Sequence, residues 1–245
     1  MKLLMQCMTC LRKLDNPKME FTEVEFRDDG RYVICCPHGH ESVTVLQEQK
    51  FEILFDIGAN AIIDGYYREA ISSFTSSLER FYEFCINIFC EHRSLDDDVY
   101  KKTWKQVSNQ SERQLGAFLF LWANELGEIP ILLSNDDIKL RNEVIHKGKI
   151  PTKEEALEYG KKVLQIIRPK IKQLRTQFPD EISAVTFKHI QACSSVKDCQ
   201  ISGGTMSVRT IISLTSGEES HNSQTLEDAL ASIVKLRKIS DNLSG

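Results

Sequence analysis

The longest regular pattern in the chain is YYREAISSFTSSLERFYEFCINIFCEH, which spans residues 66–92. Its apolar side chains recur at steps of three and four residues, the period of one face of a helix. They are Tyr67, Ala70, Ile71, Phe74, Leu78, Phe81, Cys85, Ile88 and Phe89. A stripe of this length predicts a long core helix against which other elements pack.

The sequence around this stripe keeps the helical period and has almost no strand signal over residues 46–178. Apolar positions in residues 46–61 predict a second helix that ends at Gly65, and we expect it to pack antiparallel to the first. The patterns that follow predict three more helices. The expected fold class is therefore mainly α, with a bundle of about five helices.

Cap signals predict where the later helices begin and end. Ser111–Gln114 and Thr152–Glu155 have the form of capping boxes, in which the side chains of the first and fourth residues bond each other's backbone N–H. Between them, Ser134 and Gly148 are placed to begin and end a shorter helix. Pro169 is expected to kink or restart the last helix.

The two ends of the chain have a different character. Residues 1–45 contain strand-like pieces at 21–26 and 31–34, and we expect them to form a small N-terminal β ribbon. Residues 179–245 contain a β-like run at 208–214 and a helical pattern at 225–238, which together predict a small C-terminal α+β extension. The sequence therefore predicts three segments, 1–45, 46–178 and 179–245.

Composition narrows the class of protein. The chain has 245 residues, 41% of them hydrophobic, and a formal net charge of −4. Any contact with nucleic acid must then come from a local basic patch and not from a global positive field. The longest apolar run is far short of the roughly 20 residues that cross a bilayer, and no signal-peptide core is visible. We expect a cytoplasmic protein with no membrane partner.

The N-terminal segment carries the strongest chemical signal. Cys7 and Cys10 form a Cys-x-x-Cys pair, and the run Cys35-Cys-Pro-His-Gly-His40 supplies a second pair. Two such pairs on either side of a hairpin are typical of a zinc ribbon, and Gly39 allows the tight turn that the second pair needs. Four ligands close the coordination shell, which predicts a structural Zn²⁺ and not a catalytic one.

The second pair is ambiguous from spacing alone, because Cys35 with His38 and Cys36 with His40 both suit tetrahedral geometry. The segment resembles the Cys-Pro-x-Gly-His knuckles of small zinc ribbons. That resemblance favours Cys36 and His40 as the partners of Cys7 and Cys10.

A second group of chemically active residues lies on the helix that is expected to end at Gly148. Arg141, Asn142 and His146 accompany isoleucines on faces that a plain solvated helix surface explains poorly. A purely structural interpretation is the alternative: Arg141 would form an ion pair with Asp137 or Glu79, and His146 would only complement the helix dipole.

These residues resemble the signature of HEPN (higher eukaryotes and prokaryotes nucleotide-binding) domains. The resemblance rests on Arg141-Asn-(three residues)-His146, on the Lys-Gly-Lys-Ile-Pro-Thr run that follows, and on the earlier helix with Tyr67-Arg-Glu-Ala70 and Ser77-Leu-Glu-Arg80. It covers residues 46–178 and implies a HEPN-like helical bundle. It also implies a dimer in which two such motifs meet at the interface.

The resemblance implies a metal-independent endoribonuclease of toxin–antitoxin or phage-defence systems. Arg141 and His146 would be its catalytic pair, Asn142 a supporting residue, and an antitoxin or defence-system protein a further partner. The chemistry suits RNA, because attack of a ribose 2′-hydroxyl on the adjacent phosphate needs a proton carrier and a positive charge. Histidine and arginine supply these two functions.

Other features leave alternatives open. Lys147 and Lys149 lie beside His146 and are candidates for holding RNA phosphates. A non-catalytic HEPN-like module is the main rival; it would use the same face for dimerisation or for binding a partner or RNA, with the ribbon as a docking element. A zinc-ribbon transcription regulator is less favoured, because no helix rich in Lys and Arg is visible.

Overall fold

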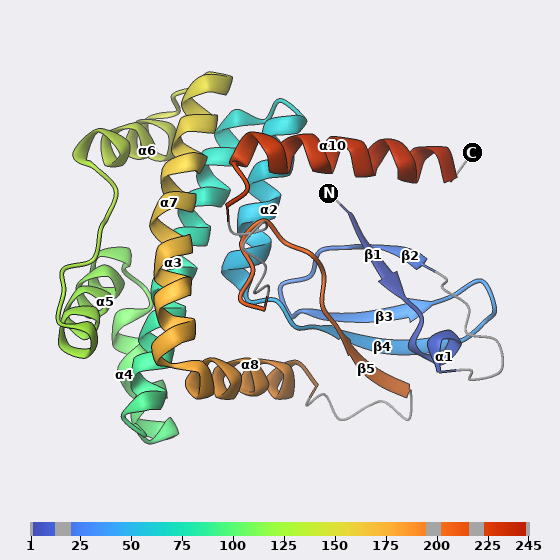
Figure 1. Ribbon diagram of the computed structural model, residues 1–245, viewed down its shortest axis with the longest axis horizontal. Helices are drawn as coiled ribbons and strands as arrows, with labels where there is room; N and C mark the ends of the chain where they lie inside the picture. The colour runs from blue at the N-terminus through green and yellow to red at the C-terminus, as the bar shows by residue number, and fades with distance from the viewer. Residues whose placement is uncertain (1, 13–20, 195–201, 216–222, 244–245) are drawn as a thin grey trace. The chain divides into compact units, whose positions relative to one another are not determined.

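The computed structural model of the protein describes residues 2–12, 21–194, 202–215 and 223–243. Figure 1 shows that these residues are mainly helical with a few short strands, as the sequence predicts. The chain divides into two compact units. We call Met1–Gln49 with Ser183–Arg209 the strand-containing unit, and Lys50–Ile182 with Thr210–Gly245 the helical unit.

This division differs from the three segments that the sequence predicts. The boundaries near residues 45 and 178 correspond roughly to changes of unit. Residues 179–245, however, do not form an extension of their own, because they are shared between the two units. The reason is that strand pairing holds part of this segment in one unit, whereas contacts with helices hold the remainder in the other.

The strand-containing unit has two small sheets. Its elements are β1 (Lys2–Gln6), α1 (Met8–Leu11), β2 (Phe21–Glu25), β3 (Arg31–Cys35), β4 (Glu41–Leu46) and β5 (Ser202–Met206). β1 and β2 pair antiparallel, and β3, β4 and β5 form the second sheet in that order. The two strands predicted between the ligand pairs exist, but they do not form a hairpin with each other, since each pairs with a different neighbour.

The last strand comes from the distant C-terminal part of the chain. β5 lies parallel to β4, with Gly203 opposite Val43. Most of α8 (Pro179–Ser194), from Ser183 onward, belongs to the same unit, where His189 Nε2 lies 3.2 Å from the carbonyl oxygen of Leu46. A parallel pair of strands requires a long connection, so local sequence contains little information about this contact.

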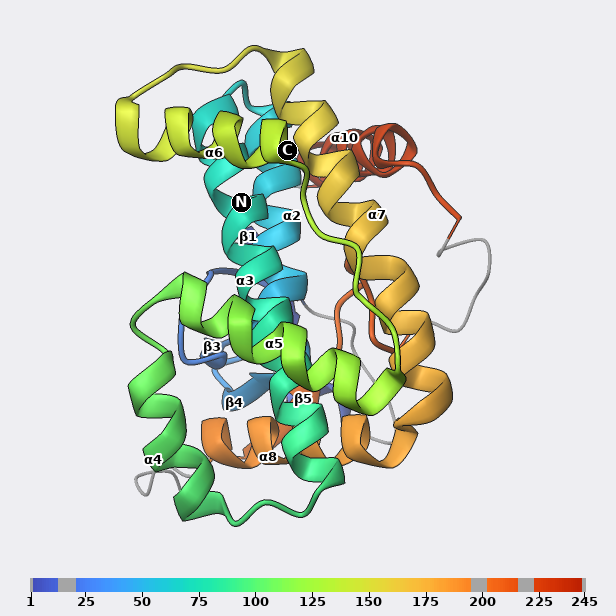
Figure 2. The ribbon, with the colours of Figure 1, turned by 90° about the vertical axis from the view of Figure 1, so that its left-hand side faces the viewer.

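The helical unit is built around the long stripe identified in the sequence. Its helices are α2 (Lys50–Ile63), α3 (Tyr67–His92), α4 (Asp97–Val107), α5 (Ser111–Leu126), α6 (Asn135–Lys147), α7 (Lys153–Gln177) and α10 (Leu226–Leu243), with the start of α8. α2, α5, α6 and α7 all pack against α3. Figure 2 shows α5 and α6 on the same side of α3. Of the nine stripe residues, all except Tyr67 are buried.

Three helices meet at Phe74. It lies on α3, and a Cβ added at Gly58 of α2 or at Gly160 of α7 would come within 2.7 Å of its ring. Only glycine therefore allows both backbones to pack this closely against the aromatic side chain. The helical period predicts α3 as the core helix, but it does not reveal these contacts.

Most predicted helix ends are confirmed. Ser134 with Asp137 and Thr152 with Glu155 form capping boxes, and Gly148 ends α6 in the left-handed conformation with φ of 72°. The prediction for Ser111 is wrong, because Gln110 is the cap residue and its side chain makes no capping bond. Pro169 lies within one continuous helix, α7. α4 and α8 were not predicted.

The predicted strand over residues 208–214 is also wrong. Its backbone groups bond carboxylates of α2 in place of another strand: the Ile211 N–H donates to Asp56 at 2.9 Å, and the Leu214 N–H donates to Glu52 at 2.9 Å. Beyond it, the predicted C-terminal helix is confirmed as α10, which packs against α2 and α7. A periodicity of two cannot distinguish a strand from an extended segment that side chains hold in place.

Candidate functional site

Two turns of the strand-containing unit bring the four favoured zinc ligands together. Cys7 precedes the short helix α1 and Cys10 lies within it, while Cys36 and His40 lie on either side of the β3–β4 turn. Gly39 closes that turn with φ of 74°, and its N–H donates to the Cys36 carbonyl oxygen at 2.9 Å. The glycine requirement that the sequence indicated is therefore met by a left-handed residue.

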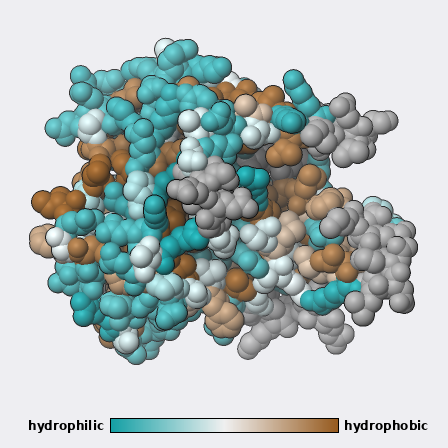
Figure 3. All heavy atoms as spheres, viewed as in Figure 1, coloured by the Kyte–Doolittle hydropathy of each residue, from teal (hydrophilic) through white to brown (hydrophobic). Residues whose placement is uncertain are grey.

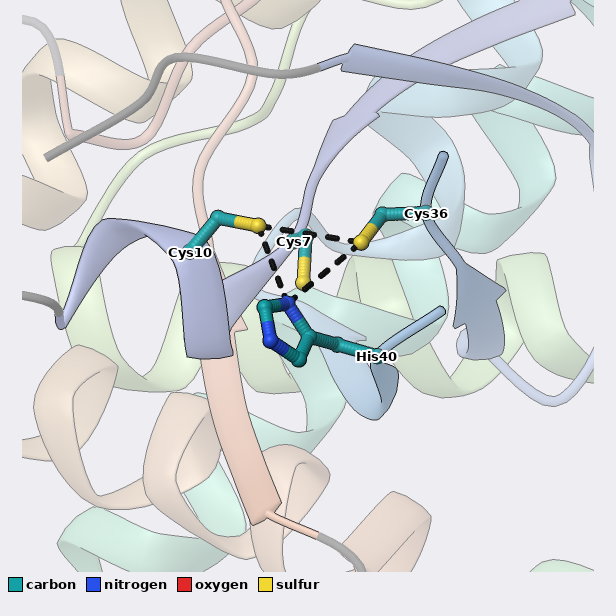
Figure 4. Close-up of side chains that lie close together, drawn as sticks. All are labelled: Cys7, Cys10, Cys36 and His40. Carbon is teal, nitrogen blue, oxygen red and sulfur yellow. Dashed lines mark hydrogen bonds between the residues drawn. The ribbon is translucent and has the colours of Figure 1, made fainter. Parts of the chain in front are cut away.

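The ligand atoms have separations that suit a tetrahedral metal ion. Figure 4 shows the three thiols and the imidazole pointing toward one another, and their ligand atoms all lie within 4.8 Å. Cys10 Sγ lies 3.6 Å from Cys36 Sγ and 3.2 Å from His40 Nδ1, and Cys36 Sγ lies 3.6 Å from His40 Nδ1. Tetrahedral zinc, with bonds of about 2.3 Å to sulfur and about 2.0 Å to nitrogen, separates its ligands by roughly 3.5–3.8 Å.

Burial and neighbouring groups shift the pKa values of two thiols in this cluster. Burial raises the pKa of Cys10 to about 12, with further contributions from Cys36 and Cys7. Burial opposes ionisation of Cys7 as well, but hydrogen bonds from the Cys10 backbone and the Ser42 hydroxyl lower the pKa of Cys7 below its ordinary value. Thiolates are the form that binds zinc, and a divalent cation among three sulfurs offsets the cost of burying their charge.

The competing ligand pair lies outside the cluster. Cys35 and His38 are exposed, whereas Cys36 is 6% exposed and belongs to the buried group with Cys7 and Cys10. Cys35 is the last residue of β3 and lies on its exposed face, whereas Cys36 directly follows the strand and its side chain is buried. The structure thus brings Cys36 and His40, and not Cys35 and His38, together with Cys7 and Cys10, and these four side chains form a group that could hold a metal ion such as zinc.

The second candidate site is α6 of the helical unit, and its ends are well defined. The Ser134 hydroxyl and the Asp137 carboxylate form the capping box, and Lys162 Nζ of α7 donates to Asp137 at 2.8 Å. Asp137 is therefore engaged by Ser134 and Lys162, and it is not an ion-pair partner of Arg141. These contacts hold α6 against the bundle.

Arg141 lines a pocket between α3, α5 and α6. Its Nε is buried and has no hydrogen-bond partner among the described residues. Glu79 of α3 lines the same pocket, where burial raises its pKa and the charges of Arg141 and Arg80 partly oppose that rise. The sequence identified Glu79 as a candidate partner of Arg141, and their charges do interact, although no ion pair closes between them in the described part of the chain.

Asn142 and His146 are not among the residues that line this pocket. Asn142 is half-buried and His146 is exposed in the last turn of α6. Within the described ranges, neither side chain forms a hydrogen bond or an ion pair. Residues five apart on a helix point about 140° away from each other, so a single copy of α6 does not direct Arg141 and His146 at one point.

The two candidate RNA-binding lysines differ in their surroundings. Lys149 Nζ lies 2.7 Å from Glu155 and 3.6 Å from Glu143, so nearby carboxylates neutralise its charge. Lys147 is exposed in the last turn of α6. Lys147 is therefore the better placed of the two for contact with phosphate.

The pocket itself was not predicted from the sequence. Its lining includes Leu115 of α5 and Leu132 and Leu133 of the α5–α6 connection, which meet Arg141 only in the folded helical unit. The one signal in the sequence was Glu79, a carboxylate next to the apolar stripe residue Leu78.

No helix among the described residues is long and apolar enough to cross a membrane. No protein-family model, curated protein or solved structure matches the chain at significant similarity.

Proposed function

We propose that the helical unit is a HEPN-like domain and that the protein is a metal-independent endoribonuclease. In this proposal two copies of α6 face each other, and a composite site combines Arg141 of one copy with His146 of the other. His146 carries protons, Arg141 holds the phosphate, and Asn142 orients the histidine or the ribose. The setting that follows from the family resemblance is toxin–antitoxin or phage defence.

The proposal rests on one observation about α6. Caps fix both ends of the helix, whereas Arg141, Asn142 and His146 form no side-chain hydrogen bond in the described part of the chain. The Nε of Arg141 is buried and has no acceptor among the described residues. Buried donors without acceptors are uncommon and costly in folded proteins. The divergent directions of Arg141 and His146 favour a site made by two copies over a site within one.

We propose a separate, non-catalytic role for the strand-containing unit. Its Cys3His cluster holds a structural Zn²⁺ that leaves no coordination position for water, so the metal contributes folding stability and not catalysis. The unit would then contact RNA or a partner protein, such as an antitoxin or another defence protein.

Cleavage of RNA by zinc-loaded protein, in buffer without added divalent metal, tests the proposal. We expect fragments that end in a 2′,3′-cyclic phosphate, because the 2′-hydroxyl is the nucleophile. His146→Ala and Arg141→Ala should each lower the rate by about 100-fold or more, as expected for loss of a proton carrier or of a charge in the transition state. Native mass measurement should give a dimer.

His38→Ala is the matched control, since His38 is also an exposed histidine but lies in the other unit. It should leave the rate unchanged. Equal cleavage by the folded His146→Ala protein would remove the proposed mechanism, and a strict monomer with full activity would remove the composite site.

A non-catalytic dimerisation or partner-binding module is the second candidate, and one observation favours it. Phe120, Ile129 and Ile131 are 84%, 89% and 76% exposed on α5 and the α5–α6 connection. Figure 3 shows hydrophobic atoms at the left-hand edge of the molecule, in this region. Exposed apolar groups that gather in one place are typical of interaction surfaces. Binding of RNA without cleavage by any preparation would favour this candidate.

A further inference from the structure

Two side chains of α8 in the strand-containing unit form a cysteine–histidine pair that shares no residue with the metal cluster. Cys193 Sγ lies 3.8 Å from His189 Nδ1, within hydrogen-bond distance for sulfur. The two residues are four apart on the helix, so their side chains lie on the same face. Both are half-buried. A thiol that is held beside an imidazole and still borders solvent is the arrangement in which histidine activates a sulfur nucleophile.

The backbone carbonyl of Leu46 determines which ring nitrogen of His189 carries the proton. His189 Nε2 lies 3.2 Å from this oxygen, which can only accept a hydrogen bond. Nε2 is therefore the donor, and Nδ1 of the neutral ring is left as an acceptor. Between the neutral side chains, the hydrogen bond then runs from the Cys193 S–H to Nδ1. This is the direction in which a proton leaves the thiol.

The second sheet holds this carbonyl group in place. Leu46 ends β4, and its N–H donates to the Gly30 carbonyl oxygen at 2.9 Å. A Cβ added at Gly30 would lie 3.6 Å from Cys193 Sγ and 3.8 Å from His189 Cε1, so the turn before β3 lies against both side chains.

Transfer of the proton to His189 creates an ion pair that this arrangement stabilises. Both ring nitrogens become donors when the imidazole is protonated, and the Leu46 carbonyl and the Cys193 thiolate each accept one hydrogen bond. The positive ring is therefore satisfied on both sides. The thiolate that results is the form of cysteine that attacks electrophiles.

We propose that Cys193 is a site of reversible S-thiolation by small disulfides, with His189 as the base that activates it. The Cys193 S–H gives its proton to His189 Nδ1, and the thiolate attacks one sulfur of the disulfide. A bond forms between Cys193 Sγ and that sulfur, the S–S bond of the reagent breaks, and the other sulfur leaves with the electron pair and takes up the proton. Cys193 is oxidised to a mixed disulfide, and the leaving half is reduced to a thiol.

Reaction of the full, zinc-loaded chain with bis(2-hydroxyethyl) disulfide, an uncharged reagent, tests this proposal. Trypsin releases residues 189–197, in which Cys193 is the sole cysteine, so mass spectrometry follows this thiol alone. From pH 8.5 to pH 6.5 the reaction of an ordinary thiol slows about 50-fold, because its ionised fraction falls. We expect the reaction of Cys193 to slow by about fivefold or less, since a thiolate paired with an imidazolium persists at lower pH. Dithiothreitol should remove the added group.

His189→Gln separates activation by the imidazole from simple exposure of the thiol. Without the base, the reaction of Cys193 should slow about 50-fold over the same pH range, as for an ordinary thiol. Gln191→Ala is the matched control, because Gln191 is exposed on the same helix α8, and it should react as the parent does. Circular dichroism checks that each variant is folded.

Three results would overturn the proposal. The first needs no variant: a fall of about 50-fold for Cys193 in the parent protein would show that its thiol is not activated. The second is a folded His189→Gln protein that keeps the parent's shallow pH dependence. The third is an added group that dithiothreitol does not remove. None of these measurements depends on the ribonuclease, because Cys193 and α6 belong to different units.

Discussion

Lys170 is a lysine buried in the helical unit. It is 5% exposed, its Nζ donates to the Ile131 carbonyl oxygen at 2.8 Å, and it lies 5.6 Å from the centre of the Trp122 ring. Burial lowers the pKa of Lys170 to about 8, with partial compensation from Cys85 and Glu128. The charged form is therefore held in the interior at neutral pH at a net cost.

This cost predicts a pH dependence of stability. Between pH 8 and the ordinary lysine value of 10.5, the unfolded chain retains the proton that the folded protein has lost, so stability due to Lys170 rises with pH. The gain is on the order of 2 kcal/mol. The difference in unfolding free energy between the parent and Lys170→Met, measured in urea at pH 7.5 and pH 10, should show it. A pH-independent difference would contradict the shifted pKa.

Cys35 and Cys36 provide a matched pair of substitutions at the metal cluster. Cys36→Ser removes a sulfur from the buried group, whereas Cys35→Ser changes an exposed side chain one residue away. We expect Cys36→Ser to lose most of the bound zinc and Cys35→Ser to keep one zinc per chain, because thiolate is the preferred ligand. Metal analysis of the purified proteins measures this. Retention of zinc by Cys36→Ser with its loss from Cys35→Ser would assign the other cysteine.

At the scale of elements, α6 depends on its ends more than on its packing. Only Asp137 and Val144 of its residues are buried, so few apolar contacts hold it. The capping box at Ser134 and the left-handed residue Gly148 satisfy backbone groups that a helix leaves unpaired. The direction of Arg141 and His146 follows from these ends.

Two glycine substitutions distinguish the effect of backbone conformation on stability from the effect of steric room for a Cβ. Neither Gly148 nor Gly116 has an atom within 4 Å of an added Cβ, but Gly148 has φ of +72° and Gly116 lies within α5. Gly148→Ala should destabilise the protein by about 1 kcal/mol, since left-handed backbone disfavours a Cβ. Gly116→Ala should stabilise it by about 0.5–1 kcal/mol, because alanine is the better helix former. Thermal unfolding measures both, and shifts of the same sign would count against this account.

At the scale of the whole molecule, the two units are stabilised in different ways. The helical unit has a core of aromatic and aliphatic side chains around α3, including Phe51, Phe74 and Phe89. The strand-containing unit has two small sheets and the Cys3His cluster. Small units with little apolar core commonly depend on a metal ion for stability.

Removal of zinc by a chelator should therefore unfold one unit and spare the other. Hydrogen exchange should show lost protection in β3, β4 and β5 together, although β5 lies near residue 204, because β5 pairs with β4. Protection in α3 should persist. Loss of protection in α3 on the same time scale would contradict independent stabilisation, and unchanged protection in β3–β5 would show that the metal is not structural.

Local sequence determined much of this protein. The long stripe of α3, the capping residues of α6 and α7, and the Cys7–Cys10 pair with a second pair among residues 35–40 could all be predicted. Each follows from interactions over a few residues, namely the helical period, a hydroxyl within reach of an N–H, or two ligands either side of a tight turn. The amphipathic helix α4 shows that such local patterns can still be missed.

Only the tertiary structure decided the remaining features. It placed β5 beside β4, gave the N–H groups of Ile211 and Leu214 to carboxylates of α2, and brought Glu79 and Arg141 into one pocket. It also placed Cys36 and not Cys35 in the buried group, because Cys35 lies on the exposed face of β3 whereas the side chain of Cys36 is buried. These contacts join residues far apart in the chain, and their free energy depends on burial that local sequence does not encode.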